Sequence, residues 1–138
     1  MLWVERKLEM THTDRSTFLR RLLIADAAIS GTFGLLLFAA AGLLERWLAL
    51  PAPLLRYSGF SLLPFAAVVF YLAKRDVLSR TGVWTVIVLN AAWVVASAAL
   101  LLAGNVEPSP LGYAFVVVQA IAVAALAEMQ YMGLRRVA

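Results

Sequence analysis

Two acidic residues lie inside stretches of the sequence that are otherwise apolar. Asp26 interrupts the first long apolar run, and Glu128 lies within the last one. An ionisable group in a bilayer is costly, so each acid is a candidate functional group. Asp26 follows Arg21 by five residues and Glu128 precedes Arg135 by seven, which correspond to about 7.5 and 10 Å of helix. If the first and last helices are neighbours, the two carboxylates share a depth and could together bind a proton or cation.

A second interpretation, which we favour, assigns no ligand to either acid. Asp26 would pair with a basic residue such as Lys74 or Arg75 at the same end of the helices, or accept a hydrogen bond from Ser30, one turn further on. Glu128 would then lie at the headgroup boundary. The sequence leaves both interpretations open.

Amide and aromatic side chains form a second polar set. Asn90, Trp93 and Ser97 recur at i, i+3 and i+7 and share one helix face. Gln119 approaches the same depth from another helix, and it lies on the face opposite Glu128, nine positions later. Side-chain amides in membranes commonly form hydrogen bonds between helices, and a buried indole N–H needs an acceptor. The set predicts a hydrogen-bonded seam, with a ligand cavity as the alternative.

Catalytic chemistry has little support in the sequence. The chain has no cysteine, and its single histidine, His12, precedes the first apolar run. These counts exclude disulfides and thiolate metal sites, and they argue against a haem held by two histidines. Motifs for phosphate binding, for a nucleophilic serine or for a His-Glu metal site are also absent. We therefore expect a non-enzymatic protein with no catalytic residue, cofactor or metal.

The composition indicates the elements that position these residues. Of the 138 residues, 63% are hydrophobic and 14% are charged, against about 45–50% and 25% in soluble domains. A soluble chain of this size could not cover so much apolar surface. We predict an all-α, polytopic membrane protein, since a helix of about 20 residues crosses a bilayer. It would have a partly amphipathic cytoplasmic segment (1–18), one transmembrane domain (19–134) and a cytoplasmic tail (135–138), with helices at about 19–44, 54–73, 82–103 and 110–132.

The connections and the basic residues predict the topology. Short links favour antiparallel neighbours, and hence an up-down antiparallel four-helix bundle. Ten of the twelve basic residues fall within residues 1–21, the second connection and the tail, and two fall on the opposite side. The positive-inside rule places both termini in the cytoplasm, N-in and C-in. Because the basic residues cluster at helix ends, we assign the net charge of +4 to topology and lipid headgroups rather than to nucleic acid.

Small residues form a close-packing face on the first helix. Ala27 and Gly31 are four positions apart, as are Ser30 and Gly34. This spacing lets two helix backbones approach closely. The face would serve packing within the bundle or association of two copies.

The segments ADAAISG, LNAAWVVAS and AEMQYMGLRR, within a chain of this texture, resemble small, uncharacterised four-helix bacterial integral membrane proteins of about this length. The resemblance covers nearly the whole chain after Met10. It implies a multi-pass protein of the bacterial inner (cytoplasmic) membrane, and it implies no reaction or ligand. Small multidrug-resistance transporters share the four-helix count and carry a glutamate in the first helix. This sequence departs from them, because its acid is Asp26, near the cytoplasmic end.

Three functions remain consistent with these features. We favour an accessory or assembly subunit that packs against a larger membrane protein, because the chain is small and its loops are short. The alternatives are a small oligomeric carrier that binds a cation or proton through Asp26 or Glu128, and a lipid- or quinone-binding bundle that uses the Asn90, Trp93 and Ser97 face. The expected partners are membrane lipids and a larger membrane protein or further copies of the chain.

Overall fold

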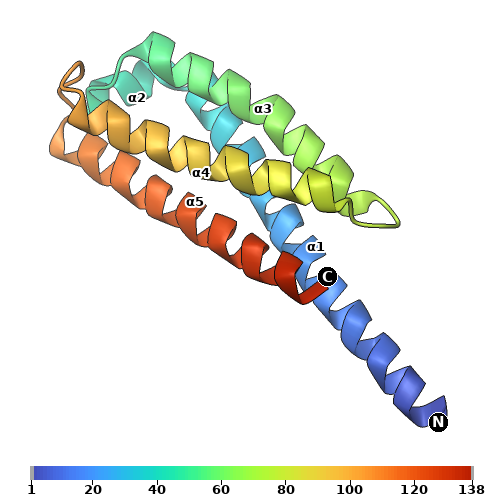
Figure 1. Cartoon of the computed structure of the whole chain (residues 1–138). Coiled ribbons are helices and arrows are strands. Elements are labelled where there is room, and N and C mark those ends of the chain that lie inside the picture. Colours follow the sequence, from blue (N-terminus) through green and yellow to red (C-terminus); the bar gives the residue numbers. More distant parts are fainter. Residues whose placement is uncertain (1, 138) are drawn as a thin grey trace.

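The protein is helical throughout the part of the chain that the structure describes. The computed structural model describes residues 2–137, and for 5–15 and 137 it describes the backbone alone. No strand occurs within residues 2–137. In chain order the helices are α1 (Leu2–Ala39), α2 (Ala41–Leu48), α3 (Ala52–Lys74), α4 (Arg80–Leu102) and α5 (Pro110–Val137) (Figure 1).

Four segments are long and apolar enough to cross a membrane. They are Ser16–Ala39, Ala52–Lys74, Arg80–Leu102 and Pro110–Arg136. Each long helix also carries large apolar side chains on its outer surface, such as Leu35, Phe60, Val95 and Ile121, which are 60–68% exposed. Lipid is the solvent in which such side chains lie at no cost. The predicted all-α, multi-pass membrane protein is confirmed at this level.

The first helix differs most from its predicted range of 19–44. Its backbone is helical from Leu2, so the segment 1–18 is continuous with it over the described residues, and the helix ends before Ala40. The chain turns there, and α2 covers the residues expected to complete the span. α2 is amphipathic and buries Ala41 and Leu48, so packing its apolar side replaces a straight continuation. The other three helices begin within two residues of the predictions, but α5 continues to Val137 rather than 132.

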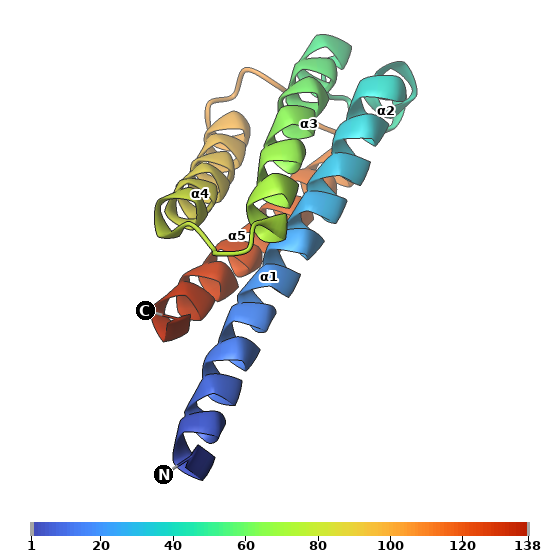
Figure 2. The ribbon, with the colours of Figure 1, turned by 90° about the vertical axis from the view of Figure 1, so that its right-hand side faces the viewer.

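The long helices lie side by side (Figures 1 and 2). α1 packs along α3 and also against α5, α4 packs along α5, and α2 lies against α3 and α5 at one end. α3 and α4 make few contacts, although they are consecutive in the chain. They meet near their connection, where Leu72 lies beside Gly82. The connection and the C-terminus lie at the end of the molecule opposite α2 (Figure 1).

Side-chain caps fix where three of the helices begin or end. Ser79 Oγ accepts a hydrogen bond from Gly82 N at the start of α4, and Ser109 Oγ accepts one from Gly112 N at the start of α5, both at 3.1 Å. Each bond satisfies an amide that has no partner within its helix. Arg20 donates to backbone carbonyls at the end of α3, including Ala73 O at 2.7 Å. A cation on these carbonyls stabilises the helix end and holds it against α1.

The apolar core is divided into two clusters at the two ends of the molecule. The cluster near the α3–α4 connection includes Leu19, Leu23, Val69 and Val83, each 0% exposed. The cluster near α2 comprises Leu37, Ala41, Leu48, Leu50, Leu55 and Val116. The two ends are therefore closely packed, and the candidate site lies between them.

The predicted small-residue face of α1 is used within the chain. A Cβ atom on Gly34 would lie 2.9 Å from Gly59 O, and one on Gly31 would lie 3.6 Å from the Ala66 Cβ. Ala27 is buried in the cluster that contains Val69 of α3. The close-packing spacing therefore brings α1 against α3.

Candidate functional site

A buried polar network centred on Asp26 joins α1, α4 and α5. Asp26 Oδ1 accepts a hydrogen bond from Ser30 Oγ at 3.1 Å. Its Oδ2 accepts from Asn90 Nδ2 at 2.9 Å and from Gln130 Nε2 at 2.7 Å. Asn90 Nδ2 also donates to Gln130 Oε1 at 3.1 Å. The four side chains are at most 8% exposed, so the network satisfies polar groups that neither water nor lipid could reach.

The partner of Asp26 on the last helix is Gln130 rather than Glu128. Gln130 is fully buried, whereas Glu128 is exposed. Residues two positions apart on a helix are separated by about 200° around its axis, so an inward Gln130 places Glu128 on the outer side. The structure therefore does not bring Asp26 and Glu128 together at one site within the chain. Within the described residues, no group of three or more His, Asp or Glu side chains could hold a metal ion.

The basic residues expected near Asp26 have other contacts. Arg20 is bound to the end of α3, as described above. Lys74 Nζ lies 5.4 Å from the Phe70 ring centre, and the Arg75 guanidinium lies 5.8 Å from that of Tyr71. The Ser30 bond considered for Asp26 from the sequence is present.

A second polar set joins α4 to α5 near the middle of their spans. Trp93 Nε1 donates to Gln119 Oε1 at 2.7 Å. Gln119 Nε2 donates to Ser97 Oγ at 3.0 Å and to Val116 O at 2.8 Å, and Ser97 Oγ donates to Trp93 O at 2.8 Å. The predicted seam between these helices is present. It is less enclosed than the Asp26 network, because Trp93 and Gln119 are only partly buried.

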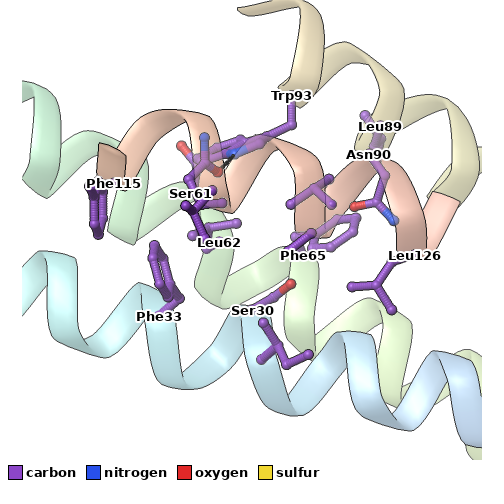
Figure 3. A pocket seen from close by; sticks show the side chains of 15 residues that line it. Ser30, Phe33, Ser61, Leu62, Phe65, Leu89, Asn90, Trp93, Phe115 and Leu126 are labelled. Atoms are coloured by element: carbon purple, nitrogen blue, oxygen red, sulfur yellow. Dashed lines mark hydrogen bonds between the residues drawn. The ribbon is translucent and has the colours of Figure 1, made fainter. Parts of the chain in front are cut away.

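A cavity of about 460 Å³ lies between the two polar sets. All four long helices line it, and it occupies the space where α3 and α4 separate (Figure 3). Its walls are mostly apolar and include the rings of Phe33, Phe65 and Phe115. The polar side chains in its lining are Ser30, Ser61, Asn90, Trp93 and Gln119. The alternative of a ligand cavity therefore coexists with the seam.

A smaller hollow of about 170 Å³ continues the cavity toward α2. Phe33, Phe115, Trp93 and Gln119 line both spaces. The rings of Phe33 and Phe115 are stacked with centres 5.3 Å apart. These four side chains lie between the two spaces, and the faces of the three aromatic rings suit a flat or chain-like apolar molecule.

The site has the size and lining of a small-molecule binding cavity. Small-molecule sites commonly have volumes of about 300–1,000 Å³, apolar walls and a few polar groups that orient the ligand, and the cavity fits this description. Side chains that line it or support it provide amides, hydroxyls, one indole and one carboxylate. The sequence indicated Asp26, Asn90, Trp93, Ser97 and Gln119 as polar candidates, but it missed Gln130 and the apolar walls.

Comparison of the chain with protein-family models, with curated proteins and with solved structures gives no match. The assignment of the candidate site therefore depends on the geometry of this chain alone.

Proposed function

We propose that this protein is a non-enzymatic membrane protein that binds an apolar small molecule dissolved in the bilayer. The cavity between α3 and α4, about 460 Å³ and lined by all four long helices, carries this proposal. Interiors of proteins are normally close-packed. A space of this size at the middle of a lipid-facing molecule would be filled by a lipid-soluble molecule rather than left empty.

The position of the cavity supports entry from the lipid. Asn90 and Trp93 lie near the middle of Arg80–Leu102, and Ser61 and Phe65 lie near the middle of Ala52–Lys74. Ser61 and Leu89, which line the cavity from α3 and α4, are both exposed. A molecule could therefore pass between these two helices without crossing a headgroup layer.

The orientation and location belong to the same proposal. We place the chain in a bacterial cytoplasmic membrane as an up-down antiparallel bundle with both termini in the cytoplasm. The excess of basic residues near the termini and the α3–α4 connection supports this orientation.

Binding of a lipid-soluble molecule has more support than transport of a cation through two acids. A site shared by Asp26 and Glu128 has no support within one chain, because Asp26 is buried and Glu128 is exposed. Asp26 already accepts three hydrogen bonds. It therefore holds helices together, and the cavity has its own lining residues.

The test uses hexylbenzene, an apolar probe, with the chain in phosphatidylcholine nanodiscs. Native mass spectrometry would count probe molecules bound per chain as the probe fraction in the bilayer is raised. We expect saturable binding of one molecule in the wild type. Ala122 lines the cavity, so Ala122→Phe fills part of it and should weaken binding at least about tenfold, or about 1.4 kcal/mol.

Ala124→Phe is the matched control. Ala124 is exposed and lies two positions along the same helix, so its side chain points to a different side from that of Ala122. The control should bind hexylbenzene as the wild type does. Binding that never saturates, or equal loss in both variants, would rule out the cavity as the site.

The accessory subunit expected from the sequence is a second candidate. The open side between α3 and α4 supports it, because a helix of a larger membrane protein could cover this side. Gentle extraction at natural expression followed by native mass analysis would test it. Recovery with a larger membrane protein supports this function, and recovery of the chain alone or with its own copies argues against it.

A further inference from the structure

The hydrogen-bond donors around the cavity already donate to other groups of the protein. This limits which ligands the cavity can hold. A side-chain amide has two N–H donors and one carbonyl acceptor, and a hydroxyl has one donor and two acceptor positions. Comparing this inventory with the hydrogen bonds of each polar lining residue shows what remains for a ligand. The ligand class inferred for the cavity rests on the proposed binding function.

The amide and indole donors have protein partners. Both N–H groups of Asn90 are used, one by Asp26 and one by Gln130. Gln119 uses both of its N–H groups, on Ser97 and on the Val116 carbonyl. The Trp93 indole donates to Gln119 Oε1 at 2.7 Å. A ligand that only accepts hydrogen bonds gains no free N–H group from these three residues.

The two hydroxyls in the lining also donate to the protein. Ser30 donates to Asp26 Oδ1 at 3.1 Å, and Ser61 donates to Tyr57 O of its own helix at 2.8 Å. An acceptor ligand would have to break one of these bonds to receive a hydrogen bond. A donor ligand breaks none, because each hydroxyl oxygen keeps acceptor capacity.

Asn90 Oδ1 is the acceptor directed at the cavity. Asn90 Nδ2 donates to Asp26 Oδ2 and to Gln130 Oε1, so the amide of Asn90 is held with its nitrogen toward the network. Figure 3 shows the Asn90 oxygen on the side of Phe65 and the nitrogen on the side of Leu126. No described residue donates to this oxygen. Every fully enclosed side-chain nitrogen and oxygen among the described residues has a partner, so Asn90 Oδ1 must be open to the cavity it lines.

We infer that the cavity takes an apolar molecule whose polar end is a hydrogen-bond donor, a hydroxyl or N–H group, that donates to Asn90 Oδ1. Apolar alcohols, phenols and hydroquinones belong to this class. Quinones, esters and ethers, which only accept, do not.

The test compares three probes of similar shape in the wild-type chain. They are 4-hexylphenol, which donates, 4-hexylanisole, which only accepts, and hexylbenzene, which does neither. Their dissociation constants would be measured by native mass spectrometry from phosphatidylcholine nanodiscs and expressed as mole fractions in the bilayer. We expect 4-hexylphenol to bind about fivefold more tightly than the other two, the factor that one net hydrogen bond provides.

Three variants locate the effect. Ala122→Phe should weaken all three probes together, and Ala124→Phe should change none. Asn90→Ala, where it folds, should remove the preference for the phenol and leave hexylbenzene binding within about twofold. The wild-type comparison requires no variant, so it holds even if Asn90→Ala does not fold.

The outcomes separate this inference from the proposed function. Equal binding of the three probes, or tighter binding of 4-hexylanisole, overturns the donor preference while the cavity remains a binding site. Absence of any binding that Ala122→Phe weakens overturns both. A phenol preference that Ala122→Phe leaves unchanged also overturns the inference, because the preference would then arise outside the cavity.

Discussion

The two sides of α3 are packed in opposite ways. Toward α1, a Cβ atom on Gly59 would lie 2.6 Å from Gly34 O and 2.7 Å from Phe38 N, so the two backbones are nearly in contact. Toward α4, the same helix presents Ser61, Leu62 and Phe65 to a cavity of about 460 Å³. One helix therefore has near backbone contact on one side and a cavity on the other.

This difference indicates that the void is a property of the sequence rather than of loose packing in general. Helices in lipid associate through small residues that let backbones approach. α3 has such residues, Gly59 and Ala66, on the side that faces α1. On the cavity side it has Leu62 and Phe65, whose rings and branches line the space without closing it. The three predictions below test the comparison, from the largest expected effect to the smallest.

Gly59→Ala should disrupt the close contact between α3 and α1. The added methyl would meet backbone atoms of α1, which cannot rotate away as a side chain can, so α1 and α3 must separate. We expect a loss of about 2–3 kcal/mol, the upper range for overpacking. Unfolding of the chain from mixed micelles with increasing dodecyl sulfate would measure it.

Gly42→Ala is the control for this change. Gly42 is on α2, and a Cβ there would meet nothing within 4 Å. The same substitution should leave stability unchanged or raise it slightly, since alanine favours a helix. Equal effects of the two substitutions would mean that close approach at Gly59 does not hold α1 and α3 together.

Asp26→Leu should weaken the polar network that joins α1, α4 and α5 beside the cavity. Asn90 and Gln130 would each lose a buried acceptor, although their mutual bond remains. We expect a loss of about 1–2 kcal/mol in the same unfolding measurement, because buried donors left without partners are costly. Asp26→Asn keeps one acceptor oxygen and should lose less. Greater stability of Asp26→Leu than of the wild type would show that burying the carboxylate costs more than its bonds return.

Trp93→Phe should have the smallest effect on stability. It removes the indole N–H that Gln119 accepts and keeps an aromatic ring at the cavity wall. Hydrogen bonds between membrane helices average about 0.6 kcal/mol, and we expect a loss of that size. A loss as large as that of Gly59→Ala would mean that this partly buried seam, rather than the α1–α3 contact, dominates the stability of the bundle.

The helices could be predicted from the sequence because lipid imposes a strong length and composition requirement. The apolar runs gave the four spans of α1, α3, α4 and α5 to within a few residues at most ends. The turn at Ala40 could not be predicted, because one glycine two positions later, Gly42, is tolerated within a helix and the residues on either side are equally apolar. The burial of Ala41 and Leu48 against neighbouring helices decides the turn, and such tertiary contacts have no local signal.

The candidate site was predictable where one helix face carried it. Asn90, Trp93 and Ser97 were placed together by their spacing, and the structure joins two of them to Gln119. Gln130 was missed although a signal existed. It lies four residues after Leu126 and four before Leu134, both buried, so it belongs to the inward stripe of α5. Glu128 was proposed because of its charge, but its position on α5 places it on the exposed face of the helix.

The cavity itself could not be predicted from the sequence. It depends on how far α3 and α4 separate, which follows from the connection at one end and the contacts of α2 at the other. No periodicity of a single helix reports the distance to its neighbour. The preference for a donor ligand depends in turn on which partner each amide takes, and this required the hydrogen bonds themselves.

The central claim is that the space between α3 and α4 binds an apolar molecule. The most direct test is a crystal structure of the chain, from crystals grown in lipid with 1-bromo-4-hexylbenzene. Anomalous scattering then locates the bromine. We predict a bromine peak inside the cavity bounded by Phe33, Phe65 and Trp93, and loss of that peak in Ala122→Phe. Bromine peaks confined to the outer, lipid-facing surfaces of the helices, with α3 and α4 closed against each other, would contradict the account.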